Sequence, residues 1–118
     1  MNKVAILVLA DAETHGDLGR VVNAMMTARE FNEAGDDVEL IFDGAGTRWP
    51  GILADPGHAS HELFAQVEDV ISGACGFCAR AFDAEEAVER AKVGLLQEYH
   101  DHPSIRRLVD SGHQVITF

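Results

Sequence analysis

The fold is decided by the segment Lys3–Ala10, which reads KVAILVLA. An uninterrupted apolar run of this length is typical of a β-strand buried on both faces of a parallel sheet. The next residues support this interpretation, because Thr14-x-x-Asp17 resembles a capping box and is followed by apolar residues at helical spacing. Val38–Phe42 is a second short apolar strand. The chain therefore opens with a βαβ unit.

The remaining chain continues to alternate between strand-like and helix-like segments. The predicted helical segments are 60–67, 77–82, 83–91 and 103–112, and the predicted strands are 67–74 and 114–118. Residues 93–96 fit either a strand or a helix. This alternation predicts a three-layer α/β sandwich on a mostly parallel sheet of about five strands. Residues 1–118 form one domain, since no linker or repeat interrupts them. We expect a flavodoxin-like strand order, in which the first and third strands are neighbours.

The composition excludes several classes of function. The 118 residues are 47% hydrophobic and 25% charged, which indicates a globular rather than a disordered chain. The net charge of −11 repels phosphate backbones and anionic lipid, so we expect no nucleic-acid and no membrane partner. No run approaches the roughly 20 apolar residues of a membrane span. The first apolar run is followed by acidic residues rather than a signal-peptide cleavage site, and we expect a cytoplasmic protein.

The two cysteines, Cys75 and Cys78, lie where the third strand passes into a helix. In a reducing cytoplasm such a pair is more often reactive or metal-binding than a structural disulfide. Helix amide groups pointing at Cys75 are expected to lower the pKa of its thiol and so favour the thiolate. Glycines on both sides of Cys75 indicate exposure at a turn. The plainer alternative is that both cysteines are small buried apolar residues.

The expected strand order also predicts which polar side chains surround the thiols. Ligand sites in open parallel sheets lie at the carboxyl ends of the strands. Loops that follow the first two strands should therefore lie beside Cys75, and they contribute Glu13, His15, Asp43, Thr47 and Arg48. Arg80 follows the cysteines on the same helix, and it or His15 could help to lower the thiol pKa.

The residues around the cysteines resemble the DsrE/DsrF-like (YchN-like) family, which includes the TusD-type sulfur-relay subunits. The resemblance rests on the first strand and helix, on the strand that ends in Phe42-Asp43-Gly44-Ala45-Gly46, on the cysteine after the third strand, and on the closing segment Gly112–Phe118. It implies a small α/β sandwich that forms homo-oligomers, as trimers or hexamers, and a carrier cysteine that holds sulfur as a persulfide.

In that family the carrier cysteine is followed by a short alanine-rich helix with basic residues and then by a turn glycine. Cys75 corresponds to the carrier position, Ala79–Phe82 to the helix and Asp83 to the turn glycine. Cys78 is an additional thiol, and Arg80 alone remains of the basic pair. The resemblance thus implies a persulfide relay between a protein sulfur donor and a protein acceptor, with Cys75 as carrier and Cys78 as auxiliary or resolving thiol.

Several alternatives to this relay remain open from the sequence. The chain could be a non-catalytic subunit that binds a partner or a small ligand, or a thiol–disulfide or peroxide-reducing protein. It could also bind a metal, although two cysteines need histidines to complete a zinc site, and His100-x-His102 is the close pair in the C-terminal half. A cluster shared between subunits is a further alternative. The primary interpretation requires no metal and no cofactor.

Overall fold

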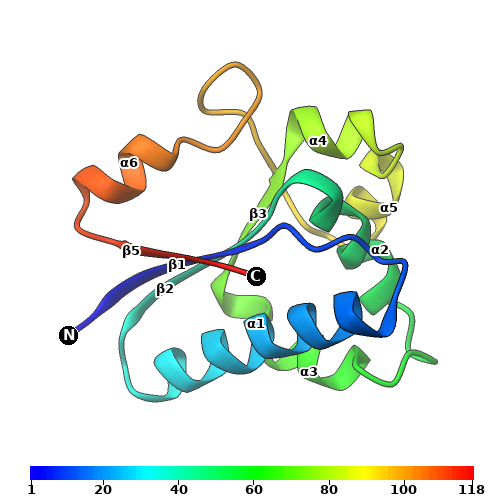
Figure 1. Ribbon diagram of the computed structural model, residues 1–118, viewed down its shortest axis with the longest axis horizontal. Helices are drawn as coiled ribbons and strands as arrows, with labels where there is room; N and C mark the ends of the chain where they lie inside the picture. The colour runs from blue at the N-terminus through cyan, green and yellow to red at the C-terminus, as the bar shows by residue number, and fades with distance from the viewer.

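The computed structural model describes residues 1–118 and confirms an α/β fold built on five parallel strands (Figure 1). The strands are β1 (Lys3–Val8), β2 (Asp37–Phe42), β3 (Ile71–Cys75), β4 (Leu95–Leu96) and β5 (Gln114–Thr117). The α-helices are α1 (His15–Glu33), α2 (Trp49–Leu53), α3 (His61–Gln66), α4 (Gly76–Ala81), α5 (Glu85–Arg90) and α6 (Ile105–Asp110). Two 3₁₀ turns, η1 (Gly44–Arg48) and η2 (Glu68–Val70), complete the chain.

The start of α1 confirms the predicted capping box. Thr14 Oγ1 accepts a hydrogen bond from the Asp17 backbone N–H at 3.1 Å, and Asp17 Oδ2 accepts from the Thr14 N–H at 3.1 Å. These bonds satisfy backbone donors that a helix start leaves without partners. The buried side of α1 then packs against β1 and β2. None of the helices combines the length and the apolar character that crossing a bilayer requires.

The strand order is β4-β3-β2-β1-β5, so the expected flavodoxin-like order is wrong. β2 lies between β1 and β3, and β1 pairs with β5 on its other side. The order arises because each step from β1 to β4 moves one strand further in the same direction, after which the chain returns to the free edge of β1. Hydrophobic periodicity identifies a strand but carries no information about the direction of that step.

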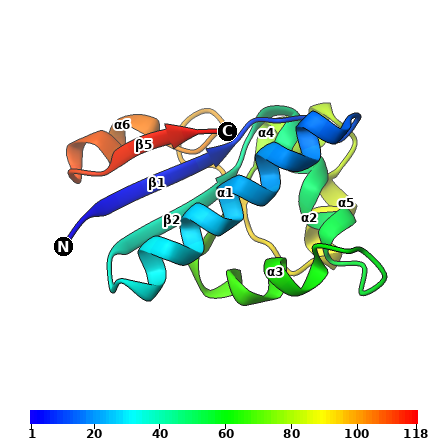
Figure 2. The ribbon, with the colours of Figure 1, turned by 60° about the horizontal axis from the view of Figure 1, so that its bottom comes forward.

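The same order explains why the two faces of the sheet are covered unequally. Crossovers between parallel strands are right-handed, so steps in one direction leave their helices on one face, and the reverse step to β5 leaves α6 on the other. Figures 1 and 2 show α1 and α3 on one side of the strands and α6 on the opposite side. The first face holds a core of 18 buried residues, whereas the α6 face holds four: Ala5, Leu7, Ile41 and Leu108.

Candidate functional site

Cys75 is the last residue of β3 and lies at the carboxyl edge of the sheet. Ala74 packs into the larger core, and because side chains alternate along a strand, Cys75 points to the α6 face. The residue is fully buried, so the predicted exposure is wrong. The flanking glycines have another purpose: a Cβ at Gly73 would lie 2.7 Å from the Gly94 carbonyl oxygen, and one at Gly76 would lie 2.8 Å from Gln97 Cγ. They allow β4 and the chain after it to lie directly against the cysteine.

A tight turn after β4 carries His102 to this cysteine. Tyr99 and His102 exchange two backbone hydrogen bonds of 2.9 Å, and His100 and Asp101 between them have φ values of 47° and 67°. Two central residues with positive φ are the signature of a type I′ turn. His102 Nδ1 forms a hydrogen bond with Cys75 Sγ at 3.2 Å. The imidazole also stacks on the ring of Phe77, with centroids 4.8 Å apart.

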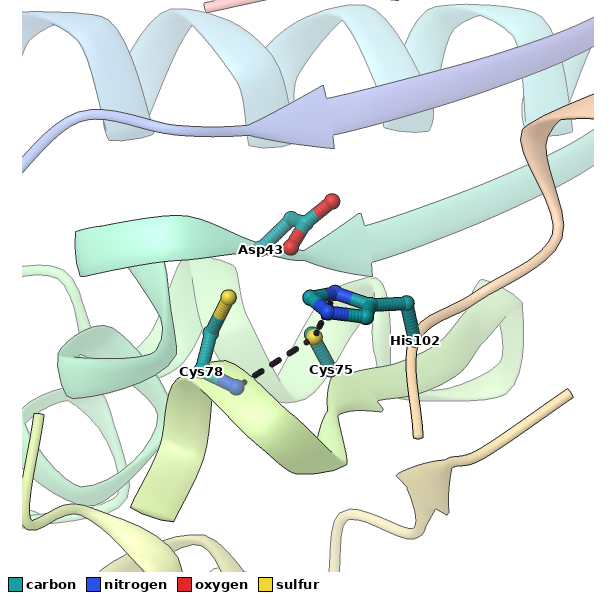
Figure 3. A group of neighbouring side chains, drawn as sticks. All are labelled: Asp43, Cys75, Cys78 and His102. Atoms are coloured by element: carbon teal, nitrogen blue, oxygen red, sulfur yellow. Dashed lines mark hydrogen bonds between the residues drawn. The ribbon is translucent and has the colours of Figure 1, made fainter. Parts of the chain in front are cut away.

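Asp43 comes to the same point from the end of β2, which pairs directly with β3. Its Oδ1 accepts a 2.8 Å hydrogen bond from the Gly44 N–H and so caps η1. Figure 3 shows Asp43, His102 and the two cysteine side chains turned towards one another. One donor atom from each of the four side chains lies within 4.8 Å of the other three. The site therefore combines two sulfurs, one imidazole nitrogen and one carboxylate oxygen.

Cys78 lies in the first turn of α4 and is partly exposed, in contrast to Cys75. Its backbone N–H donates to Cys75 Sγ at 3.4 Å, which closes the turn between the two thiols. Both cysteines are free thiols. Because Cys78 is the more accessible of the two, a reagent or a partner protein meets it first.

The surroundings of Cys75 raise the pKa of its thiol to about 12, contrary to the prediction of a lowered value. Burial is the largest cause, and the Cys78 side chain and the Asp43 carboxylate act in the same direction. The Cys78 backbone N–H opposes them, as expected of a helix amide, but one donor does not balance the loss of solvent. In this arrangement Cys75 holds its proton at neutral pH.

Three of the side chains predicted around the thiols lie elsewhere. Arg48 pairs with Glu13 at 2.8 Å and with Asp11 at 2.7 Å, which forms a separate ionic cluster after β1. His15 is exposed at the start of α1. For Glu13 and His15 the strand order is the reason, because β2 separates the loop after β1 from the end of β3. Arg48 follows β2, but its ion pairs hold it at Asp11 and Glu13 instead.

Of the three remaining predicted neighbours, Asp43 lies at the thiols, whereas Thr47 and Arg80 make other contacts. Thr47 is buried in η1 and donates its hydroxyl to the Gly44 carbonyl at 2.9 Å. Arg80 forms ion pairs with Glu85 at 3.2 Å and with Asp101 at 3.5 Å. Since Asp101 is a central residue of the turn that carries His102, Arg80 ties α4 to that turn without contacting the thiols itself.

His102 is the site residue that the primary interpretation omitted. The sequence contained one signal for it, the His100-x-His102 pair considered for a zinc site. Its position depends on the pairing of the two-residue strand β4 with β3 and on a turn built without glycine. Turns of this type usually contain Asn or Gly, so the sequence His100-Asp101 does not predict one.

Comparisons with known proteins add one relative without a known activity. The chain is 27% identical over 96 residues to the uncharacterized protein MJ0733 of Methanocaldococcus jannaschii, and the match covers 81% of this chain and 78% of that protein. No family model and no solved structure matches the chain. This relative is an archaeal protein of similar length without a known activity. The function of the present chain is therefore inferred from its site.

Proposed function

We propose that the protein is a sulfur carrier that receives a sulfane sulfur on its cysteine pair and passes it to an acceptor protein. The observation that carries the proposal is the convergence of two free thiols with an imidazole at the carboxyl edge of the sheet. Thiol-to-thiol sulfur transfer needs an accessible first thiol and a second one nearby. Cys78 and Cys75 meet these two conditions in that order.

Sulfur enters by exchange at Cys78. The Cys78 thiolate attacks the outer sulfur of a donor persulfide, R–S–SH, the donor S–S bond breaks, and the donor leaves as the thiolate R–S⁻. Cys78 is then Cys78–S–SH, and the thiol proton that Cys78 lost is taken up by the released donor. Nothing is oxidised or reduced overall, so the step requires no cofactor.

A second exchange moves the sulfur inward to Cys75. The Cys75 sulfur attacks the outer sulfur of the Cys78 persulfide, Cys78 leaves as a thiolate, and the thiol proton of Cys75 passes to His102 Nδ1 at 3.2 Å. The buried position of Cys75 shields the stored persulfide from solvent. An acceptor thiolate later removes the outer sulfur by the same reaction in reverse. This scheme keeps Cys75 as the carrier expected from the sequence and assigns entry to Cys78.

Two exposed aromatic side chains near Cys78 offer partner proteins an apolar surface to bind. Phe77, next to Cys78, is 53% exposed, and Tyr99, at the base of the His102 turn, is 65% exposed. Exposed aromatic side chains are enriched at protein interfaces. The oligomer, a trimer or hexamer, remains part of the proposal and can be measured by light scattering of the purified protein.

Mass spectrometry of the reduced, chelator-treated protein after exposure to a low-molecular-weight persulfide tests the proposal. The wild-type protein should gain the mass of one sulfur atom, and the fragment that contains residues 75–78 should carry it. Cys78→Ser should lose the adduct, whereas Cys75→Ser should form it at Cys78 and lose it faster on addition of an acceptor thiol. A wild-type protein without the adduct rejects the carrier and leaves a binding subunit, for which both serine variants should retain partner binding.

A further inference from the structure

The distances between the donor atoms of Asp43, Cys75, Cys78 and His102 are close to those of a tetrahedral metal site. Zinc bonds of roughly 2.0–2.3 Å in a tetrahedron require neighbouring donor atoms roughly 3.3–3.8 Å apart. Cys75 Sγ and His102 Nδ1 are 3.2 Å apart, and no two of the four donor atoms are further apart than 4.8 Å. Movements of about 1 Å or less would therefore complete the tetrahedron.

The chemistry of the donors selects the class of ion. Two thiolates and an imidazole are soft or borderline ligands, which favour zinc and its neighbours over magnesium or calcium. Four protein donors in a tetrahedral arrangement leave no position for water, which is the pattern of a structural or regulatory zinc site. The three-residue spacing of Cys75-x-x-Cys78 falls within the range of zinc-binding cysteine pairs.

Three of the four donors, Asp43, Cys75 and His102, are held in position by a second contact. The Cys78 N–H donates to Cys75 Sγ, Asp43 is oriented by the Gly44 N–H, and His102 is fixed by the type I′ turn and by stacking on Phe77. The turn is fastened to α4 by a 2.9 Å hydrogen bond from the Phe77 N–H to the Asp101 carbonyl. Outer contacts of this kind orient metal ligands and commonly contribute 10- to 100-fold to metal affinity.

The site also lacks a cation of its own. Other carboxylates that follow or lie on these strands have arginine partners, as Asp11 has Arg48 and Glu39 has Arg107. Asp43 has no ion pair, although it faces two thiol groups. A partly buried carboxylate among potential thiolates is stabilised by a positive charge, and a divalent ion supplies it.

We infer that Asp43, Cys75, Cys78 and His102 of the reduced protein bind one zinc-class divalent cation. Binding releases the two thiol protons to solvent and joins the ends of β2 and β3 to the turn after β4. The inference does not depend on the sulfur-carrier proposal, although the two occupants share both thiols. A bound cation would block sulfur loading, and a persulfide or a Cys75–Cys78 disulfide would release the cation.

Titration of the full-length, phosphine-reduced and chelator-treated protein with Co²⁺ tests the inference directly. One equivalent should produce the visible absorption of tetrahedral cobalt with sulfur-to-cobalt charge transfer, and Zn²⁺ should displace it with one ion per chain. Competition with a chromophoric chelator then gives the zinc affinity. Absence of the thiolate-to-cobalt band, or a zinc stoichiometry well below one, overturns the inference.

Variants separate this site from adventitious binding. Asp43→Asn, Cys78→Ser and His102→Gln should each lower zinc affinity at least about tenfold. His100→Asn is the matched control on the same turn, where Asn tolerates the positive φ, and it should retain wild-type affinity. Circular dichroism confirms that each variant is folded, and unchanged affinity in His102→Gln together with Cys78→Ser refutes the assigned ligands. Sulfur loading is measured on chelator-treated protein without metal, so either proposal can fail while the other stands.

Discussion

His102 Nδ1 lies 3.2 Å from Cys75 Sγ although 27 positions separate the two residues in the chain. The distance is short because β3 pairs with β4 and a type I′ turn immediately afterwards folds the chain back over the end of β3. Cys75 is therefore contacted by a loop that follows α4, α5 and β4 in the chain. A thiol at the end of a strand becomes a buried, hydrogen-bonded group once that loop is in position.

The first prediction concerns the relative reactivity of the two thiols in reduced, metal-free protein. Cys78 should be alkylated first at neutral pH, since it is partly exposed and Cys75 is buried. The pKa of Cys75 is raised from 9.0 to about 12, so its thiolate fraction at neutral pH is roughly 10³-fold below that of the unfolded chain. Its alkylation rate should rise with pH up to about 12 and should rise sharply in urea. Peptide mass mapping at several times measures both rates, and equal rates for Cys75 with and without urea would contradict the assigned environment.

The second prediction concerns the close approach of β4 to β3. In Gly73→Ala the new Cβ would meet the Gly94 carbonyl oxygen and Leu96, at a φ of 153° that side chains rarely adopt. We expect a loss of about 2–3 kcal/mol in the free energy of unfolding, together with faster alkylation of Cys75. Gly94→Ala is the control, because no atom lies within 4 Å of its Cβ position. Urea unfolding of both variants measures the difference, and equal stabilities would refute a steric role for Gly73.

The third prediction concerns a charged network on the α6 face. Glu39 accepts hydrogen bonds from Arg107 at 3.0 and 3.2 Å and from Ser72 at 3.0 Å, and Arg107 lowers the pKa of the Glu39 carboxyl below its ordinary 4.5. Glu39→Gln should cost about 1–2 kcal/mol at neutral pH, because Arg107 loses a charged acceptor.

The sign of the pH dependence follows from the lowered pKa. Below pH 4.5 the unfolded chain binds a proton at Glu39 more readily than the folded protein does. The contribution of Glu39 to the free energy of unfolding is therefore complete above pH 4.5, and it is lost as the pH falls through the lowered pKa of the folded protein. The stability difference between wild type and Glu39→Gln should narrow on acidification. The exposed Glu89→Gln should show neither effect, and a constant difference from pH 7 to pH 3 would rule out the linkage.

The fourth prediction concerns the capping box of α1. Thr14→Ala removes the acceptor for the Asp17 N–H and should lower the free energy of unfolding by about 1 kcal/mol. Thr27→Ala is the matched control inside the same helix, where alanine is the better helix former, so it should be neutral or slightly stabilising. Thermal or urea unfolding distinguishes the two, and equal losses would indicate that the cap does not contribute.

The sequence predicted those features that local patterns determine. Lys3–Ala10 and Val38–Phe42 have strand-like apolar runs, and Thr14-x-x-Asp17 has the spacing of a cap, so the first βαβ unit and the α/β class follow from them. These elements can be predicted because each pattern depends only on residues that are close together along the chain.

The order of the strands and the composition of the site are non-local, and the sequence did not determine them. The expected neighbourhood of β1 and β3 led to Glu13 and His15, which lie elsewhere. Asp43, predicted from the loop after the second strand, does lie at the thiols, whereas His102 is not among the predicted neighbours. The glycines beside Cys75 suggest an exposed turn, but in the fold they allow the close packing that buries it. A glycine pattern alone does not distinguish an open turn from a close backbone approach.

The pairing of β5 with β1 has a consequence for the newly made chain. β1 has five buried residues, more than any other strand, and until β5 has been synthesised one of its edges has no partner for its backbone groups. An unpaired apolar edge is a template for association with other chains. The protein thus passes through an aggregation-prone stage that ends when β5 pairs with β1, and chains truncated before Gln114 should accumulate in inclusion bodies rather than fold.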